Sequence, residues 1–327
     1  MGSLATHLRA FAPEDYDTWV AAINRCYAEY PVSVRELRHQ DDTFDRSRFF
    51  MDRRVVEDDG RLVGGFDLRH RPSRFHPHRY ALDLFVSPEA RRRGHGSALY
   101  DAALELLELR HALAAVVMVT ESMPEGVRFA EQRGFVEVKR DWESRLTVAD
   151  FDFGKFAGAD ERVAASGIRI STYADELVRD PEAVRKTYEL TSTLRADVPS
   201  TDQATHETIE EWRAHWVDAP SFLPDAFFIA IGPDGRWLGM SNLEKQIEDP
   251  TFAWQGLTAV HRDVRGAGIA TALKLRTIRY AQAMGVDHIK TWNDQSNLPM
   301  LAINEAMGFV RQPAWLSMEL TLPTQPA

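Results

Sequence analysis

The sequence is poor in cysteine, in long apolar runs and in positive charge. Cys26 is the single cysteine among 327 residues, so neither an intrachain disulfide nor a cysteine-ligated metal cluster can form, as is typical of a reducing cytoplasm. No apolar run approaches the ~20 residues that a membrane-spanning helix needs, and the N-terminus lacks the apolar stretch of a secretory signal. We therefore expect a cytoplasmic protein without membrane segments.

Basic residues are outnumbered, with 39 Lys and Arg against 49 Asp and Glu and a net charge of −10. A nucleic-acid-binding protein needs a broad basic face, so we expect no nucleic acid partner. A small anionic ligand stays compatible with this charge, because a few backbone amides and an arginine can hold phosphate locally. Hydrophobic residues at 44% are ordinary for a globular protein, and the length predicts about two domains.

The two halves of the chain repeat each other at an offset of 174 residues. The segment 86–96 resembles 260–270, and Gly134-Phe135 corresponds to Gly308-Phe309. At an offset of 175, Asp59-Gly60-Arg61 corresponds to Asp234-Gly235-Arg236. Such a long period indicates a duplicated domain rather than a solenoid. We expect an N-terminal domain at 1–150, a glycine-containing linker at 151–166 and a C-terminal domain at 167–327.

Hydrophobic periodicity predicts the same order of elements in both halves. For the first half we expect strands near 8–11, 54–57, 62–68, 80–86, 114–119 and 135–148, and helices near 13–27, 94–110 and 125–132. For the second half we expect a strand near 168–171, helices ending near 194 and beginning near 206, a hairpin at Asp234-Gly235, a strand ending at 260, helices near 267–284 and 298–307, and strands near 288–292 and from 309.

Each half contains a strand ending in valine, then an arginine, then small residues that open a helix. The first N–H groups of a helix have no partner within it, and with the helix dipole they form an anion site. Glycines let a phosphate approach this backbone closely. A dinucleotide-binding loop would have the pattern Gly-x-Gly-x-x-Gly directly after the first strand, whereas these loops follow several strands and lack the third glycine. The Walker pattern Gly-x4-Gly-Lys is absent as well. The physical prediction is therefore pyrophosphate binding at two helix N-termini.

The motif Arg-x-x-Gly-x-Gly/Ala after a valine-ending strand resembles the acetyl-CoA signature of the GNAT superfamily of N-acetyltransferases. Arg91, Gly94 and Gly96 fill it in the first half, and Arg265, Gly268 and Ala270 in the second. The duplicated layout is similar to that of members such as mycothiol synthase. The resemblance implies an α/β (α+β) fold of two tandem GNAT-like domains, each a mixed, mostly antiparallel twisted sheet flanked by helices. The strand before each glycine loop is expected to splay from the next strand.

The resemblance also implies acetyl-CoA, or another acyl-CoA, as the cosubstrate. In the C-terminal domain it implies contacts with Thr258, Ala259, Val260, Arg265, Gly266, Ala267, Gly268, Ile269, Ala270, Thr271, Asn293 and Asn297. In the N-terminal domain it implies contacts with Leu84, Phe85, Val86, Arg91, Arg92, Arg93, Gly94, His95, Gly96 and Ser97.

The C-terminal half is the more complete and is expected to be catalytic. It carries Asn293, Asn297 and Asn304, where the first half has Val119, Met123 and Ala130. The N-terminal half either supports the fold only or binds CoA without turnover. The family commonly places a tyrosine at the position of Asn304. An amide can donate a hydrogen bond to a leaving thiolate but cannot give up a proton at neutral pH, so Asn304 is expected to stabilise at most.

Direct attack of an amine on a thioester needs a base. Glu244 is the candidate base in the second half and lies on the strand that precedes the strand leading into the loop. A solvated carboxylate at the sheet edge is an equally or more favoured interpretation of this residue. Asp83 is the corresponding candidate in the first half. His261 and His288 lack a second ligand at metal spacing, so we expect no metal site.

The acceptor is expected to be a small-molecule amine, bound near the segment Asp197–Asp202 and the following aromatics Trp212, Trp216, Phe222 and Phe227, for which core packing is the simpler interpretation. The protein is expected to be a monomer or a homodimer. Two other hypotheses remain: a non-catalytic acetyl-CoA-binding sensor or partner protein, and an enzyme whose chemistry lies in the N-terminal half with Asp83 as base.

Overall fold

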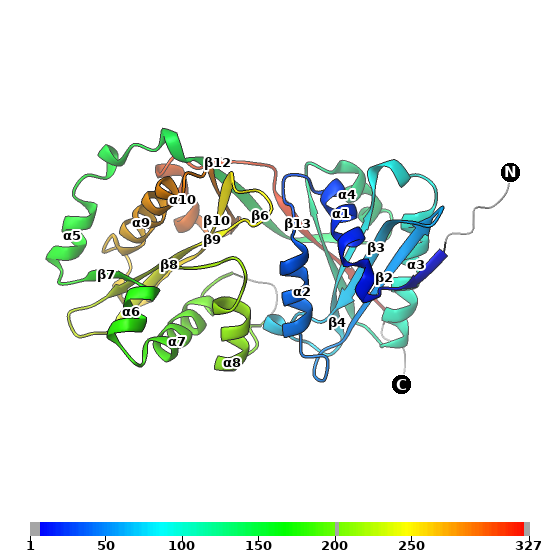
Figure 1. Ribbon diagram of the computed structural model, residues 1–327, viewed down its shortest axis with the longest axis horizontal. Helices are drawn as coiled ribbons and strands as arrows, with labels where there is room; N and C mark the ends of the chain where they lie inside the picture. The colour runs from blue at the N-terminus through cyan, green and yellow to red at the C-terminus, as the bar shows by residue number, and fades with distance from the viewer. Residues whose placement is uncertain (1–6, 200–202, 324–327) are drawn as a thin grey trace. The chain divides into compact units, whose positions relative to one another are not determined.

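The computed structural model describes residues 7–199 and 203–323. These residues form two compact units (Figure 1). Unit 1 comprises Met1–Arg140, Thr201–Thr205 and Ala314–Ala327, and unit 2 comprises Asp141–Ser200 and His206–Pro313. Neither unit is contiguous in sequence, because the chain returns to unit 1 at its C-terminal end.

The sheet of unit 1 has the strand order β1-β2-β3-β4-β5-β13, in which β4 and β5 are the parallel pair. Its elements are β1 (His7–Ala10), η1 (Pro13–Asp15), α1 (Tyr16–Cys26), α2 (Val34–Thr43), β2 (Met51–Asp58), β3 (Arg61–Arg69), η2 (Pro72–Arg74), β4 (Arg79–Val86), η3 (Pro88–Ala90), α3 (His95–Leu109), β5 (Ala114–Thr120), α4 (Pro124–Glu131) and β13 (Trp315–Thr321).

The helices of unit 1 cover both faces of its sheet. Trp19 of α1 packs with Val55 and Phe85 on one face. Gly96 of α3 lies close to the side chain of Val86, which alternates with Phe85 and therefore points to the other face. α1 and α2 are seen in front of the strands in Figure 1.

The sheet of unit 2 has the order β6-β11-β10-β9-β8-β7, with β10 and β11 parallel. Its elements are β6 (Val136–Thr147, of which Asp141–Thr147 lie in unit 2), η4 (Val148–Asp150), η5 (Phe153–Phe156), α5 (Ala159–Ala165), β7 (Arg169–Thr172), α6 (Tyr173–Arg179), α7 (Ala183–Arg195), α8 (Ile209–Trp212), the π-helical turn η6 (Arg213–Val217), β8 (Phe222–Ile231), β9 (Trp237–Lys245), β10 (Phe252–Val260), η7 (Arg262–Val264), α9 (Ile269–Met284), β11 (His288–Asp294), α10 (Leu298–Ala306) and β12 (Val310–Arg311).

Two hydrophobic clusters show which helices cover which face of this sheet. α6 and α7 contribute Tyr173 and Leu190 to a cluster with Phe227. α9 contributes Leu273 to a cluster with Phe228, the next residue of β8. Because successive residues of a strand alternate between faces, α7 and α9 lie on opposite sides of the sheet, as Figure 1 shows.

The last strand of each sequence repeat pairs outside its own repeat. Asp141–Thr147 of β6, which follow the first repeat, pair with β11 of unit 2. β13, which follows the second repeat, pairs with β5 of unit 1 from Trp315–Thr120 to Thr321–Ala114. The compact units thus differ from the boundaries expected from the repeat. The expected linker at 151–166 forms η5 and α5, whose Val163 packs in the core of unit 2.

The expected fold class is confirmed: both sheets are mixed, mostly antiparallel and flanked by helices. The periodicity did not lead us to expect α2 or α5. A signal for α2 was present, since Ser33 and Glu36 form a reciprocal capping box at its start. In the described parts of the chain, none of the helices has the length and apolar character to cross a membrane.

Candidate functional site

The two parallel strand pairs separate beside the glycine loops. In unit 1 the pairing of β4 with β5 ends at Ala81–Val116, although β4 continues to Val86. In unit 2 the pairing of β10 with β11 ends at Trp254–Lys290, although β10 continues to Val260. Each sheet therefore has the splay that the resemblance implied, and the backbone of β4 and β10 beyond it is available to a ligand.

The glycine loops place unpaired N–H groups at the start of α3 and α9. Gly94 and Gly268 are the N-caps, with φ of 93° and 77°. The first bond into each helix is the one to its N-cap carbonyl, donated by Ala98 and by Ala272, each over 3.0 Å. The N–H groups between cap and donor precede this ladder and point out of the helix. A Cβ added at either N-cap glycine would meet nothing within 4 Å, so the space beside both helix N-termini is open.

The two signature arginines fold their loops back onto the preceding strand. Arg91 Nε donates to the carbonyl of Val86, and Arg265 Nε donates to that of Val260, both over 3.1 Å. Arg265 also pairs with Asp197 at 2.7 Å. The resemblance implied cofactor contacts for both arginines, and the structure shows each bonded to the strand that precedes its own loop.

The N-terminal loop is basic but partly neutralised. Arg93 pairs with Asp58 at 2.7 Å, and the buried ring of His95 lies 3.5 Å from the same carboxylate. Ser97 Oγ accepts from Arg133 over 3.0 Å. Arg92 has φ of 65°, where the C-terminal loop has Gly266 at 82°. The N-terminal loop thus differs from the C-terminal one in its side-chain contacts and in having arginine where the other has Gly266.

Glu244 lies on the α7 face of unit 2, opposite Trp254 of β10 in register. Its Oε1 accepts from Asn242 Nδ2 over 3.2 Å. Beside it, the register of β9 with β10 shifts between Gln255 and Thr258, so β10 has one extra residue there. A Cβ on Gly256 would lie 2.6 Å from Asn242 Nδ2, so a larger residue at this bulge would displace the Asn242 side chain. Bulges are common next to active sites, where they redirect a side chain or end the strand pairing.

The α9 face of unit 2 carries a connected group of neutral polar side chains. Thr277 of α9 donates to Gln255 Oε1 over 2.8 Å, and Gln255 Nε2 donates to Ser241 Oγ over 3.1 Å. Ser241 Oγ shares a 2.7 Å hydrogen bond with Thr258. Thr291 of β11 donates to the carbonyl of Gln255 over 3.2 Å, at the point where the parallel pairing has ended. The side chain of Thr258, which was predicted to contact the cofactor, is therefore hydrogen-bonded within the protein. Mainly its backbone groups remain available to a ligand.

The three expected asparagines fall into two arrangements. Asn304 Nδ2 donates to Asn293 Oδ1 over 2.7 Å, and Asn304 is only 2% exposed. Asn304 Oδ1 is buried without a hydrogen-bond partner in the described structure. Asn297 is instead the N-cap of α10 and accepts from the N–H of Met300 over 3.4 Å. The structure brings Asn293 and Asn304 together and gives Asn297 a structural role.

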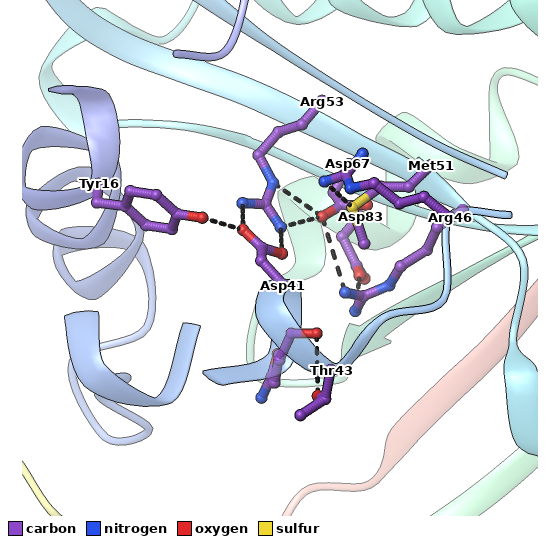
Figure 2. Close-up of polar contacts among 10 residues, drawn as sticks. Tyr16, Asp41, Thr43, Arg46, Met51, Arg53, Asp67 and Asp83 are labelled. Carbon is purple, nitrogen blue, oxygen red and sulfur yellow. Dashed lines mark hydrogen bonds and ion pairs between the residues drawn. The ribbon is translucent and has the colours of Figure 1, made fainter. Parts of the chain in front are cut away.

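Unit 1 has a buried charge network on its α1 face, shown in Figure 2. Arg53 makes paired hydrogen bonds to Asp41 at 2.7 and 2.9 Å and to Asp67 at 2.6 and 2.9 Å. Tyr16 donates to Asp41 over 2.6 Å. The register aligns Arg53, Asp67 and Asp83 in one row across β2, β3 and β4.

Asp83 ends this row at the splay of unit 1. Its side chain is 52% exposed, yet burial raises the pKa of its carboxyl above the ordinary value, with Arg69 opposing this and Asp67 adding to it. Asp83 lies two residues beyond the last β4–β5 pair, with its carboxyl accessible to solvent. Tyr27 and Tyr30 contact Trp315 of β13, with ring centroids 6.2 and 5.2 Å apart.

The expected acceptor segment is described only in part. Asp197 pairs with Arg262 and Arg265, which keeps the pKa of its carboxyl below the ordinary value. Ser200, Thr201 and Asp202 lie outside the described residues. Trp212 and Phe227 are fully buried, which supports core packing over a pocket lining for these two rings. Residues 7–199 and 203–323 contain no group of three or more His, Cys, Asp or Glu side chains that could hold a metal ion.

Lys274 was missed by the sequence reasoning. It lies on α9 with 1% exposure, and burial lowers the pKa of its ammonium group from 10.5 to about 7. The sequence contains a weak signal only: Leu273 and Leu275 flank it, but lysine is normally assigned to the solvated face of a helix.

Comparisons with known proteins agree with this geometry. The family model described as the acetyltransferase (GNAT) family matches residues 15–135 and 188–309. A mycothiol acetyltransferase of Saccharomonospora viridis is 26% identical over 240 residues, which cover 71% of each chain. A mycothiol acetyltransferase of Thermomonospora curvata is 27% identical over 229 residues, which cover 70% of each chain.

Two solved structures share the fold over nearly their whole length. A tandem GNAT protein from the clavulanic acid biosynthesis pathway aligns with a TM-score of 0.74 and 22% identity, covering 98% of this chain and 99% of that one. A GCN5-related N-acetyltransferase from Sphaerobacter thermophilus aligns with a TM-score of 0.68 and 20% identity, covering 97% and 95%.

Proposed function

The chain belongs to the acetyltransferase (GNAT) family, and from this premise we propose that it transfers an acetyl group from acetyl-CoA to the amine of a small molecule. Family membership makes it an enzyme that moves an acyl group from an acyl-CoA to an amine. The carrying observation is the splay of β10 from β11 beside the open loop of Gly268. We propose the cytoplasm as its location, which fits the single cysteine.

The residues present fit such a cosubstrate. The N–H groups at the start of α9 would hold the pyrophosphate, since they lack acceptors and lie at the positive end of a helix dipole. The backbone of Thr258, Ala259 and Val260 lies beyond the last β10–β11 pair and would bind the pantetheine amides. Backbone N–H groups at the bulge would polarise the thioester carbonyl.

We assign turnover to the C-terminal half. There the amine attacks the carbonyl carbon directly, the C–N bond forms and the C–S bond breaks. Glu244, close to the bulge on the α7 face, would take the proton of the attacking ammonium, directly or through water. The bulge supports this choice, because β3 and β4 of unit 1 pair without a register shift.

A second candidate places the chemistry in unit 1, and Asp83 is the observation that favours it. A carboxylate that meets solvent beside the splay, and whose pKa is raised above the ordinary value, accepts a proton more readily than an ordinary carboxylate. In this alternative the Tyr27, Tyr30 and Trp315 rings would receive the amine by cation–π contact.

Calorimetric titration with acetyl-CoA distinguishes the two candidates. The titration is carried out on the wild-type protein and on the variants Gly268→Leu and Gly94→Leu. Matched controls are Gly235→Leu and Gly60→Leu, hairpin positions that also have positive φ and open surroundings. The controls introduce the same backbone strain of about 1 kcal/mol but lie outside the two glycine loops at the starts of α3 and α9.

We expect a binding site that Gly268→Leu abolishes and Gly235→Leu retains, together with loss of acetylation of an amine panel. Loss with Gly94→Leu only would move the chemistry to unit 1. Wild-type protein that binds no acetyl-CoA would refute the proposed function itself.

A further inference from the structure

Lys274 is a buried amine that the mechanism above does not use. Its ammonium group forms no hydrogen bond or ion pair with the described residues, and its Nζ lies 4.7 Å from the centroid of the Phe309 ring. Lysines with 1% exposure are rarely found without a partner. The ring offers a weak cation–π contact that replaces little of the lost hydration.

The position of Lys274 on α9 is above the splay. Thr277, three residues further along α9, bonds to Gln255, which directly follows the last residue of β10 paired with β11. α9 begins at the loop that follows β10 and runs back along the sheet. Lys274 precedes Thr277 by three residues and therefore lies ~4.5 Å closer to the loop along the helix axis. The contact with Phe309, which follows α10, places the side chain on the β11 side of α9.

Among the residues that the structure describes, none supplies a compensating charge to Lys274. The polar side chains that β10, β11 and α10 present on this face are neutral: Gln255, Thr258, Thr291, Asn293 and Asn304. The neighbouring Arg276 and Arg279 of α9 pair with Asp160 of α5. Burial is accordingly the single cause of the lowered pKa of Lys274. A donor without an acceptor thus lies on the side of the splay where Asn304 Oδ1 is an acceptor without a donor.

We propose that Lys274 is the polar partner of the acyl-pantetheine arm in the C-terminal unit, hydrogen-bonding its thioester end and giving a proton to the sulfur as the C–S bond breaks. This inference rests on the proposed function. The step balances: the electron pair of the C–S bond stays on sulfur, the Nζ proton moves to it, and CoA leaves as the thiol. Neutral Lys274 then regains its proton from water.

The proton affinities suit this transfer. A thiol has an ordinary pKa of about 8.5, above the value of about 7 for Lys274, so a free thiolate beside this ammonium takes the proton. Asn304 cannot do so at neutral pH. In unit 1 the residue 174 positions earlier is Tyr100, whose ring lies 6.4 Å from that of Phe135, so the corresponding place holds another side chain with a titratable tip.

The test measures proton uptake on binding, by calorimetry at pH 8 in buffers of different ionisation enthalpy. Free Lys274 is mostly neutral at pH 8, and a hydrogen bond to a carbonyl or thioester favours its charged form. We expect uptake of a fraction of a proton when acetyl-CoA binds, because this hydrogen bond raises the pKa of Lys274 toward that of the thiol without exceeding it. We expect none with adenosine 3′,5′-bisphosphate, which lacks the arm.

Three variants complete the experiment. Lys274→Met should bind acetyl-CoA without proton uptake and lose about 10²-fold in kcat, the usual effect of removing a general acid. Lys274→Arg keeps the charge but holds its proton too tightly to give it up, so it should stay slow. Lys290→Met removes another buried lysine, one that lies over the Phe252 ring, and should keep the uptake.

Proton uptake that persists in Lys274→Met, or that also occurs with adenosine 3′,5′-bisphosphate, overturns the inference. So does a Lys274→Met enzyme of unchanged kcat. In each of these cases acetyl-CoA still binds, and the proposed function stands. Absence of acetyl-CoA binding in the wild-type protein instead refutes the proposed function.

Discussion

At the scale of single residues, buried polar groups separate the two halves most clearly. Unit 1 pairs its buried Arg53 with two carboxylates, those of Asp41 and Asp67. Unit 2 buries Lys274 with no counter-charge. A buried charge without a partner costs free energy that the rest of the fold must offset, and such groups concentrate where a ligand completes the site.

The lowered pKa of Lys274 predicts a pH-dependent stability. Below about pH 7 the folded and unfolded chains both hold the proton, and above about pH 10.5 neither does. Between these values the unfolded chain holds a proton that the folded chain has released. The free energy of unfolding of the ligand-free protein should therefore rise with pH, by about 1.4 kcal/mol per unit from this group.

Urea unfolding of wild type and Lys274→Met at several pH values between 7 and 10 measures this contribution. The free energy of unfolding of the wild type should increase relative to that of the variant as the pH rises across this range. Parallel curves would show that Lys274 is hydrated in the folded protein.

At the scale of elements, helix ends do much of the positioning. The N-terminus of α9 presents its unpaired N–H groups to the splay, whereas the N-terminus of α10 is closed by Asn297. The same residue type thus serves two purposes around α10: Asn297 at the cap and Asn304 in the buried pair with Asn293.

Asn297→Ala should lower the free energy of unfolding by about 1 kcal/mol, the usual effect of removing an N-cap side chain. Asn297→Ser should restore most of this, because its hydroxyl can accept the same bond. Chemical denaturation gives the stability, and calorimetry gives the acetyl-CoA affinity, which we expect to stay unchanged. A variant with native stability and weakened binding would instead make Asn297 a cosubstrate residue.

At the scale of the whole molecule, the sequence repeats and the folding units differ. Each repeat of the chain ends with a strand that does not complete the sheet of its own repeat: β6 pairs with β11, and β13 pairs with β5. Cutting the chain between the repeats therefore leaves β5 and β11 each without a partner along one edge, and an unpaired long edge exposes backbone groups and invites aggregation.

The fragment 1–150 should consequently fail to unfold cooperatively when heated and followed by circular dichroism. The matched control joins residues 1–140 through a flexible linker to residues 312–323, which include β13. This second protein should show a cooperative transition. A cooperative transition in fragment 1–150 would mean that β13 is dispensable for unit 1.

The sequence by itself determined the duplication, the order of most elements and the two glycine loops, and its family resemblance implied the splay beside each loop. These features are local: a glycine with positive φ at a helix start, a valine-ending strand and an apolar stripe are properties of a few neighbouring residues. Only the tertiary structure decided which strand closes each sheet, because pairing of β13 with β5 joins segments far apart in sequence. It also decided that Lys274 is buried and Asn297 caps α10, since burial and bonding depend on the elements packed around a side chain rather than on its type.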